Sequence, residues 1–191
     1  MGPMPYGIPS GYARVGRITE AVVDANVAYL TVTCDTGDTA LLTFEIIDRS
    51  VWRWSMLPYG VMQPHATTIV SRKRELNHPV SLGQAGGSYV LTGGDLTLTL
   101  SADPWSFSFT DKSGNEVVRD NPGDVDGLGR PFVPPLGFVR DQTGVQRIFF
   151  TLHLDADEHL FGTGEKFTRV DKVGQRIISW TQDAFGSTSD G

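Results

Sequence analysis

Apolar and polar residues alternate with a period of two through most of the chain, and no other feature constrains the fold as strongly. In DLTLTLS, residues 95–101, three leucines share one face and two threonines the other. Successive side chains of a β-strand point to opposite sides of the sheet, so such a run predicts a strand with one buried face. Similar runs predict strands at Val27–Cys34, Thr39–Asp48, Ser50–Leu57, His65–Ser71 and Ser88–Gly93.

A second alternating run follows the first after the turn Ala102-Asp103-Pro104. This run, WSFSFT at 105–110, places its three aromatic residues on one face, so the two runs predict a β-hairpin. The turn DKSGN at 111–115 leads into another predicted strand, NEVVRD. A later run, Gln146–Asp155, alternates as well: one face carries Ile148, Phe150, Leu152 and Leu154, and the other carries Phe149, Thr151 and His153.

These runs predict an all-β fold. Ten or more short strands, with no convincing amphipathic helix between them, are typical of an antiparallel sandwich or barrel. The 191 residues suffice for one domain with a core. The segment Asp120–Arg140 breaks the alternation and contains four prolines. Its apolar members are expected to pack against another part of the protein: Phe132, Val133, Leu136 and Phe138.

Composition excludes several classes of protein. The net charge of −6 argues against a nucleic-acid partner, which requires a clustered basic surface. No run approaches the roughly 18 consecutive apolar residues of a membrane span. Cys34 is the single cysteine, so an internal disulfide is impossible. The start, MGPMPYGIPSGYARVG, lacks the basic and apolar regions of a signal peptide, so we expect a cytoplasmic location.

Motifs for phosphate, metal and nucleophile sites fail on spacing. In GTGEK, residues 162–166, the glycines are two apart and Phe167 stands where a P-loop needs Ser or Thr. A calcium loop at 122–133 would have Pro122 and Val133 at its first and last ligand positions. The four histidines show no zinc spacing, and no G-x-S-x-G motif occurs. We therefore expect no cofactor and no metal, and interpret Asp155–His159 as a polar turn.

Residues 150–186, FTLHLDADEHLFGTGEKFTRVDKVGQRIISWTQDAFG, resemble the segment that closes the N-terminal β-sandwich domain of glycoside hydrolase family 31. These enzymes are retaining α-glucosidases, α-xylosidases and relatives. The resemblance lies in four ordered features: the acidic turn at 155–159, an aromatic followed by G-x-G-E-[KR]-F at Phe161–Phe167, the Asp-Lys-x-Gly turn at Asp171–Gly174, and W-x-x-D at Trp180–Asp183. It implies an antiparallel β-sandwich of the galactose-mutarotase-like supersandwich type.

The resemblance also implies roles for particular residues. Asp183 would project to the rim of the catalytic pocket and accept hydrogen bonds from sugar hydroxyls, which suits an ionised carboxylate. The alternative is a plain loop aspartate. Trp180 offers an apolar face to a pyranose ring, or is a buried strand tryptophan. Gly162 and Gly164 would serve a backbone bend that a Cβ disfavours, with Glu165 as the structural carboxylate that holds it, or as a direct sugar contact.

The implied domain organisation is a flexible leader at 1–12, the sandwich at 13–182, and at 183–191 the start of a substrate-rim loop leading to a (β/α)8 barrel. A retaining glycosidase needs two carboxyl groups roughly 5 to 5.5 Å apart, and in this family both lie on the barrel. The chain ends at Gly191 and contains no W-x-D-M-N-E nucleophile segment. We therefore expect the non-catalytic domain of a parent glycosidase of carbohydrate metabolism, inactive on O-glycosyl bonds when alone.

The expected partners are the barrel and, through the parent enzyme, an α-glucoside or α-xyloside. The ending FGSTSD resembles the α-xylosidase branch. An apolar surface is expected where the barrel packs, at the Pro-rich segment and after Asp183. Two alternatives stay open. One is a free-standing carbohydrate-binding module with an exposed aromatic platform. The other is a sugar mutarotase, which needs a His/Glu pair in one cleft.

Overall fold

The computed structural model describes residues 10–59, 78–121, 135–140, 146–162, 169–175 and 177. The chain divides into two compact units, residues 1–153 and 154–191. All eleven strands of the described residues lie in the first unit, and the same residues contain no helix. The described residues therefore include no helix long and apolar enough to cross a membrane. The fold of the first unit is an all-β antiparallel sandwich, as the alternation predicts.

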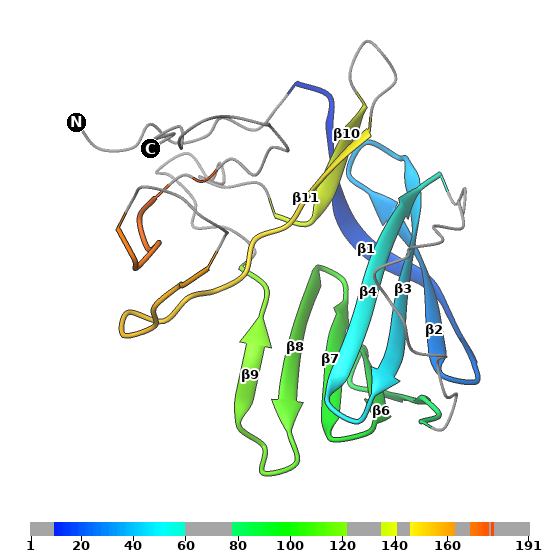
Figure 1. Ribbon diagram of the computed structural model, residues 1–191. Helices are drawn as coiled ribbons and strands as arrows, with labels where there is room; N and C mark the ends of the chain where they lie inside the picture. Colours follow the sequence, from blue (N-terminus) through cyan, green and yellow to red (C-terminus); the bar gives the residue numbers. More distant parts are fainter. Residues whose placement is uncertain are drawn as a thin grey trace, which may run out of the picture. The chain divides into compact units, whose positions relative to one another are not determined.

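Six antiparallel strands form the first sheet, in the order β11-β10-β1-β2-β3-β4 (Figure 1). The chain enters through β1 and meanders to β4, whereas β10 and β11 add to the free edge of β1 from far along the sequence. The strands are β1 (Tyr12–Asp24), β2 (Val27–Cys34), β3 (Thr39–Asp48), β4 (Val51–Pro58), β10 (Gly137–Arg140) and β11 (Gln146–Phe149).

Five consecutive strands form the second sheet, an antiparallel meander in the order β5-β6-β7-β8-β9, drawn in green in Figure 1. The predicted hairpin of DLTLTLS and WSFSFT is confirmed, because β7 and β8 pair in register from Leu96↔Asp111 to Ala102↔Trp105. The strands are β5 (Ser81–Ala85), β6 (Ser88–Gly93), β7 (Leu96–Ala102), β8 (Trp105–Asp111) and β9 (Glu116–Arg119).

Buried side chains from both sheets form one hydrophobic core. In β2 and β3 every second residue is buried, as a strand with one face on a core requires. Each large apolar side chain that is fully buried contributes about 1.5 to 3 kcal/mol. The central members are Leu30, Val32, Leu42, Phe44 and Ile46 from the first sheet and Leu91, Leu98, Leu100, Phe107 and Phe109 from the second.

Three strands of the structure have no counterpart in the sequence-based prediction. Strand β1 has two register irregularities, between Val15 and Arg17 and between Ile18 and Glu20, and such bulges interrupt the period of two. Strand β5 is mostly exposed and so lacks an apolar face. Strand β10 has three buried residues in succession and lies in the Pro-rich segment. The predicted strand His65–Ser71 lies outside the described residues.

The end of the Pro-rich segment packs into the core. Leu136 is 4% exposed and Phe138 1% exposed, which confirms that these apolar residues pack against another part of the protein. The amide of Val15 donates to the carbonyl of Leu136 (2.9 Å), and the Tyr12 hydroxyl donates to the carbonyl of Pro135. The expectation of an exposed apolar surface here is therefore wrong for residues 135–139, because β10 completes the first sheet. Phe132 and Val133 lie outside the described residues.

The predicted strand Gln146–Asp155 is shorter than expected and exposed on its apolar face. Strand β11 ends at Phe149, and the following residues join the second sheet through one bridge, Asp120↔Leu152. The face that carries Ile148, Phe150 and Leu152 is about half exposed, although alternation in a strand usually indicates a buried apolar face.

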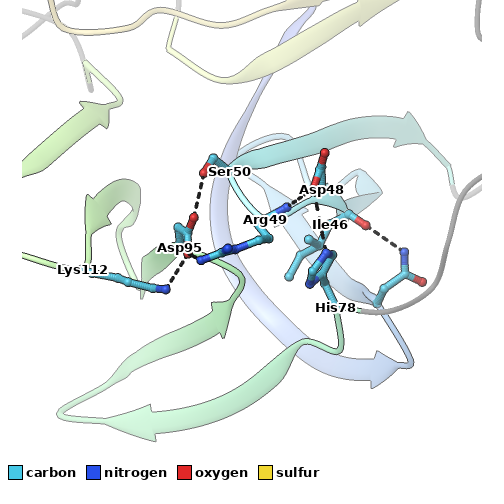
Figure 2. Close-up of polar contacts among 8 residues, drawn as sticks. Ile46, Asp48, Arg49, Ser50, His78, Asp95 and Lys112 are labelled. Atoms are coloured by element: carbon cyan, nitrogen blue, oxygen red, sulfur yellow. Dashed lines mark hydrogen bonds and ion pairs between the residues drawn. The ribbon is translucent and has the colours of Figure 1, made fainter.

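The β3–β4 turn of the first sheet is linked to the β6–β7 turn of the second by a carboxylate (Figure 2). Asp95 accepts hydrogen bonds from Arg49 Nη2 (3.0 Å) and Ser50 Oγ (3.1 Å), and its amide donates to the Arg49 carbonyl (2.6 Å). Lys112 forms a further ion pair with the same carboxylate. The hydrogen bonds from Lys112 and Arg49 lower the pKa of Asp95 to about 2.

This link makes the stability of the sandwich sensitive to acid. Because the folded pKa lies below the unfolded value of about 3.9, the ionised Asp95 stabilises the fold above pH 4. That contribution is lost as the pH falls from about 4 to about 2. We expect the Asp95→Asn variant to lose less of its thermal stability over this range than the wild type does, measured by circular dichroism. The variant Asp24→Asn, at the exposed end of β1, is the control and should match the wild type.

Cys34 is a core residue of β2 and not a nucleophile. It is 5% exposed, and burial, assisted by Asp35 and Asp38, raises the pKa of its thiol to about 12. A thiol with such a pKa is protonated at neutral pH, and the thiolate is the nucleophilic form.

Candidate functional site

The second unit carries the segments that the sequence singles out, and its described residues begin with an acidic turn. The amide of Asp155 donates to Glu158 Oε2 (2.7 Å), and the amide of Glu158 donates to the carbonyl of Asp155 (3.1 Å). This reciprocal pair closes the turn at both ends. It confirms that Asp155–His159 forms a polar turn. No group of three or more metal-ligating side chains occurs in the described part of the chain.

Asp171 connects this turn to the later Asp-Lys-x-Gly segment. Its carboxylate accepts hydrogen bonds from the amides of Val173 (3.0 Å) and Leu160 (3.4 Å). It also lies 2.8 Å from Nδ1 of His159. The Val173 amide and then the His159 ring lower the pKa of this carboxyl below its ordinary value. Asp171 is therefore ionised at neutral pH and serves as a structural acceptor for two separate segments.

The Asp-Lys-x-Gly turn is closed by its own backbone and by neighbouring side chains. Gly174 has φ 73°, and the amide of Gln175 donates to the carbonyl of Lys172 (3.0 Å). Lys172 is only 7% exposed, with its Nζ donating to the carbonyl of Arg169 (2.6 Å). Its amide donates to the carbonyl of Leu160 (2.7 Å). Residues 155–162 and 169–175 are thus fixed to each other on either side of the GTGEKF segment in the sequence.

Gly162 is the one described member of the motif residues Gly162, Gly164, Glu165, Trp180 and Asp183. Its φ is 105°, a backbone conformation that strains any residue with a Cβ. An added Cβ would meet no atom within 4 Å, so conformation and not crowding favours glycine here. The other four residues lie outside the described residues, and their roles stay predictions.

One buried carboxyl group was missed by the sequence analysis. Asp120 is 9% exposed at the end of β9, where its Oδ1 accepts a hydrogen bond from the amide of Phe107 (3.1 Å). Burial raises the pKa of this carboxyl, although the Phe107 amide opposes the shift. The residue opens the Pro-rich segment, whose lack of alternation gives no signal for burial. It holds the end of β9 to β8, because its amide also donates to the Phe107 carbonyl (3.0 Å).

Two antiparallel sheets around one core define the class of β-sandwich domains. The chain belongs to the family described as the glycosyl hydrolase 31 N-terminal galactose mutarotase-like domain, whose model matches residues 41–191. This match confirms the resemblance carried by residues 150–186 and the predicted galactose-mutarotase-like sandwich. No curated protein matches the chain significantly.

Solved structures share the fold at low sequence identity. An uncharacterised protein of Listeria monocytogenes EGD-e is 18% identical with a TM-score of 0.65, and the match covers 84% of this chain and 14% of that one. The cycloalternan-forming enzyme of Listeria monocytogenes, in complex with a pentasaccharide substrate, is 17% identical with a TM-score of 0.63 and the same coverages. A Flavobacterium johnsoniae GH31 dextranase, complexed with isomaltotriose, is 18% identical with a TM-score of 0.59; the match covers 83% of this chain and 18% of the dextranase. The aligned region therefore spans less than a fifth of each solved chain.

Proposed function

We propose that this chain is the non-catalytic N-terminal domain of a retaining α-glycosidase, supporting a (β/α)8 catalytic barrel and contributing to the rim of its substrate site. The observation that carries this proposal is the family match over residues 41–191. Retaining hydrolysis requires a pair of carboxyl groups, and the resemblance to family 31 assigns both of them to the barrel. In this proposal the polypeptide that follows carries out catalysis. The reaction that it catalyses cannot be assigned from the fold of this domain alone.

For the substrate, we propose an α-glucoside in preference to an α-xyloside. The solved proteins with this fold were crystallised with glucose, with isomaltotriose and with a pentasaccharide substrate. Isomaltotriose consists of glucosyl units. The resemblance of FGSTSD to the α-xylosidase branch is the argument for xylose, and parallel assays with a glucoside and a xyloside decide between the two.

Within this proposal, residues 13–182 form the supporting domain and residues 183–191 begin the loop at the rim, after a leader at 1–12. Asp183 accepts hydrogen bonds from sugar hydroxyls, and Trp180 gives an apolar face to the ring or is a buried strand tryptophan. The hydrogen bonds of Asp171 with Leu160, His159 and Val173 support this role, because they hold together the described residues that precede Trp180 and Asp183 in the sequence.

Replacing Asp183 with alanine in the parent enzyme should lower kcat/KM by about 10- to 100-fold, because hydrogen bonds to a charged group contribute about 1.5 to 3 kcal/mol. The measurement is the initial rate of hydrolysis of a nitrophenyl α-glucoside over a range of substrate concentrations. Asp24→Ala, at the exposed end of β1, is the control and should keep wild-type kinetics. Equal rates for both variants would contradict a substrate-binding role for Asp183.

The proposal as a whole is tested by the reading frame beyond Gly191. A (β/α)8 barrel of about 250 residues, with two aspartates at strand ends, is the expected continuation. A frame that ends there would overturn the glycosidase assignment. Titration of the purified chain with glucose would then test a free-standing carbohydrate-binding module.

A further inference from the structure

The segment that follows β10 carries a stripe of exposed apolar side chains. Ile148, Phe150 and Leu152 are 46%, 51% and 42% exposed, and they alternate along five residues. Alternate residues of an extended chain lie on one face, so the three side chains form a continuous row. We call these three residues the apolar stripe.

The backbone beneath the apolar stripe is held at both ends by hydrogen bonds. In β11, Ile148 pairs with Phe138 of β10. Further on, Leu152 forms a bridge with Asp120, the amide of Asn121 donates to the carbonyl of Thr151 (2.9 Å), and the amide of His153 donates to the carbonyl of Arg119 (3.0 Å). The segment therefore runs from the edge of the first sheet to the edge of the second, and Figure 1 shows its yellow trace passing from β11 towards the end of β9.

The apolar stripe is continuous with the core. The ring of Phe150 packs edge-on against Trp54, with centroids 5.1 Å apart, and Trp54 lies 6.4 Å from the core residue Phe107. On the other face, Phe149 contacts the ring of Tyr12 at 5.8 Å. Phe149 and Phe150 thus place one aromatic side chain on each face at the end of β11, whereas Thr151 and His153 on the second face are polar.

We propose that the apolar stripe is the surface on which the larger remainder of the parent polypeptide packs, through apolar side chains of its own. This inference rests on the proposed function. Its support is the size of the proteins with this fold, because the match occupies 14% to 18% of their chains. A remainder that belongs to the same polypeptide also has a high effective concentration at the stripe.

Hydroxyl-radical footprinting with mass spectrometry tests this inference. The 191-residue chain and the product of its complete reading frame are oxidised under identical conditions, and oxidation of each side chain is quantified. We expect oxidation of Ile148, Phe150 and Leu152 to fall at least about fivefold in the complete product, because buried side chains exclude solvent. Val22 and Val51, which are 51% and 52% exposed, are internal controls and should be oxidised equally in both.

A matched pair of variants separates packing from folding. The complete product with Ile148→Ser, Phe150→Ser and Leu152→Ser should unfold at a lower temperature. The same changes should lower the unfolding temperature of the 191-residue chain by less, because these side chains are already about half exposed in it. Val22→Ser with Val51→Ser should affect neither.

Three other results would each overturn the proposal, and each has a different cause. Unchanged oxidation of the apolar stripe in a complete product that hydrolyses α-glucosides would refute the docking surface and leave the proposed function intact. Protection of the 191-residue chain that grows with its own concentration would show that a second copy covers the stripe. A reading frame without a further domain would remove the occupant and the proposed function together.

Discussion

Replacing Gly94 with alanine is expected to destabilise the sandwich by about 4 kcal/mol, or roughly 10 °C in thermal midpoint. Gly94 has φ 62°, which strains any residue with a Cβ. An added Cβ would lie 2.8 Å from the carbonyl carbon of Arg49 and closer still to its oxygen. Backbone cannot rotate away as a side chain can, so the β3–β4 and β6–β7 turns must separate. Separation removes the hydrogen bond from the Asp95 amide to Arg49.

Gly86→Ala is the matched control for this prediction. Gly86 has φ 58°, close to that of Gly94, but an added Cβ there would meet no atom within 4 Å. It should therefore show the conformational cost alone, about 1 kcal/mol. Chemical denaturation of both variants gives the comparison. Equal losses of stability would show that contact between the two turns contributes nothing.

Replacing Phe138 with alanine is the second substitution with a large expected effect, about 3 to 5 kcal/mol in the free energy of unfolding. The Phe138 side chain is 1% exposed and lies 5.5 Å from the ring of Tyr59. Its removal leaves a cavity between β10 and the rest of the core, which close packing does not refill. Urea denaturation followed by tryptophan fluorescence measures the loss.

Phe150→Ala is the comparison variant, because it makes the same Phe-to-Ala change at a half-exposed position. Phe150 is about half exposed, so the 191-residue chain should lose less than about 1 kcal/mol on its replacement. If the two phenylalanine variants were equally destabilised, the placement of Phe138 in the core and of Phe150 at the surface would be wrong.

Sequence reasoning recovers those strands whose environment matches a simple rule. β2, β3, β7 and β8 each present one face to the core, and their burial follows the alternation residue by residue. The alternation does not predict β1, because two bulges shift its register. The alternation does not predict β10 either, because Gly137, Phe138 and Val139 are all buried and the strand has no polar face.

The opposite error arises at Ile148, Phe150 and Leu152. Their alternation predicts burial, yet the described chain leaves them uncovered. A periodic pattern reports which residues share a face but not which molecule covers that face.

The sequence predicts the motifs and the turns of the candidate site, but not the hydrogen bonds that join the turns. The turns at Asp155–His159 and Asp171–Gly174 follow from composition, since Asp and Gly favour such geometry. Nothing local indicates that Asp171 accepts hydrogen bonds from Leu160 and His159, because these residues lie eleven and twelve positions earlier. The burial of Asp120 likewise depends on strands that meet only in the folded chain.

Comparing the hydrolytic activity of the complete gene product with that of the 191-residue chain tests the central claim most directly. Both are purified and assayed with nitrophenyl α-glucoside and α-xyloside, and the first sugar released is examined by NMR. The account predicts that the complete product hydrolyses the α-glucoside with initial release of the α-anomer, whereas the 191-residue chain hydrolyses neither substrate. Hydrolysis by the 191-residue chain alone, or a complete product without α-glycosidase activity, would contradict it.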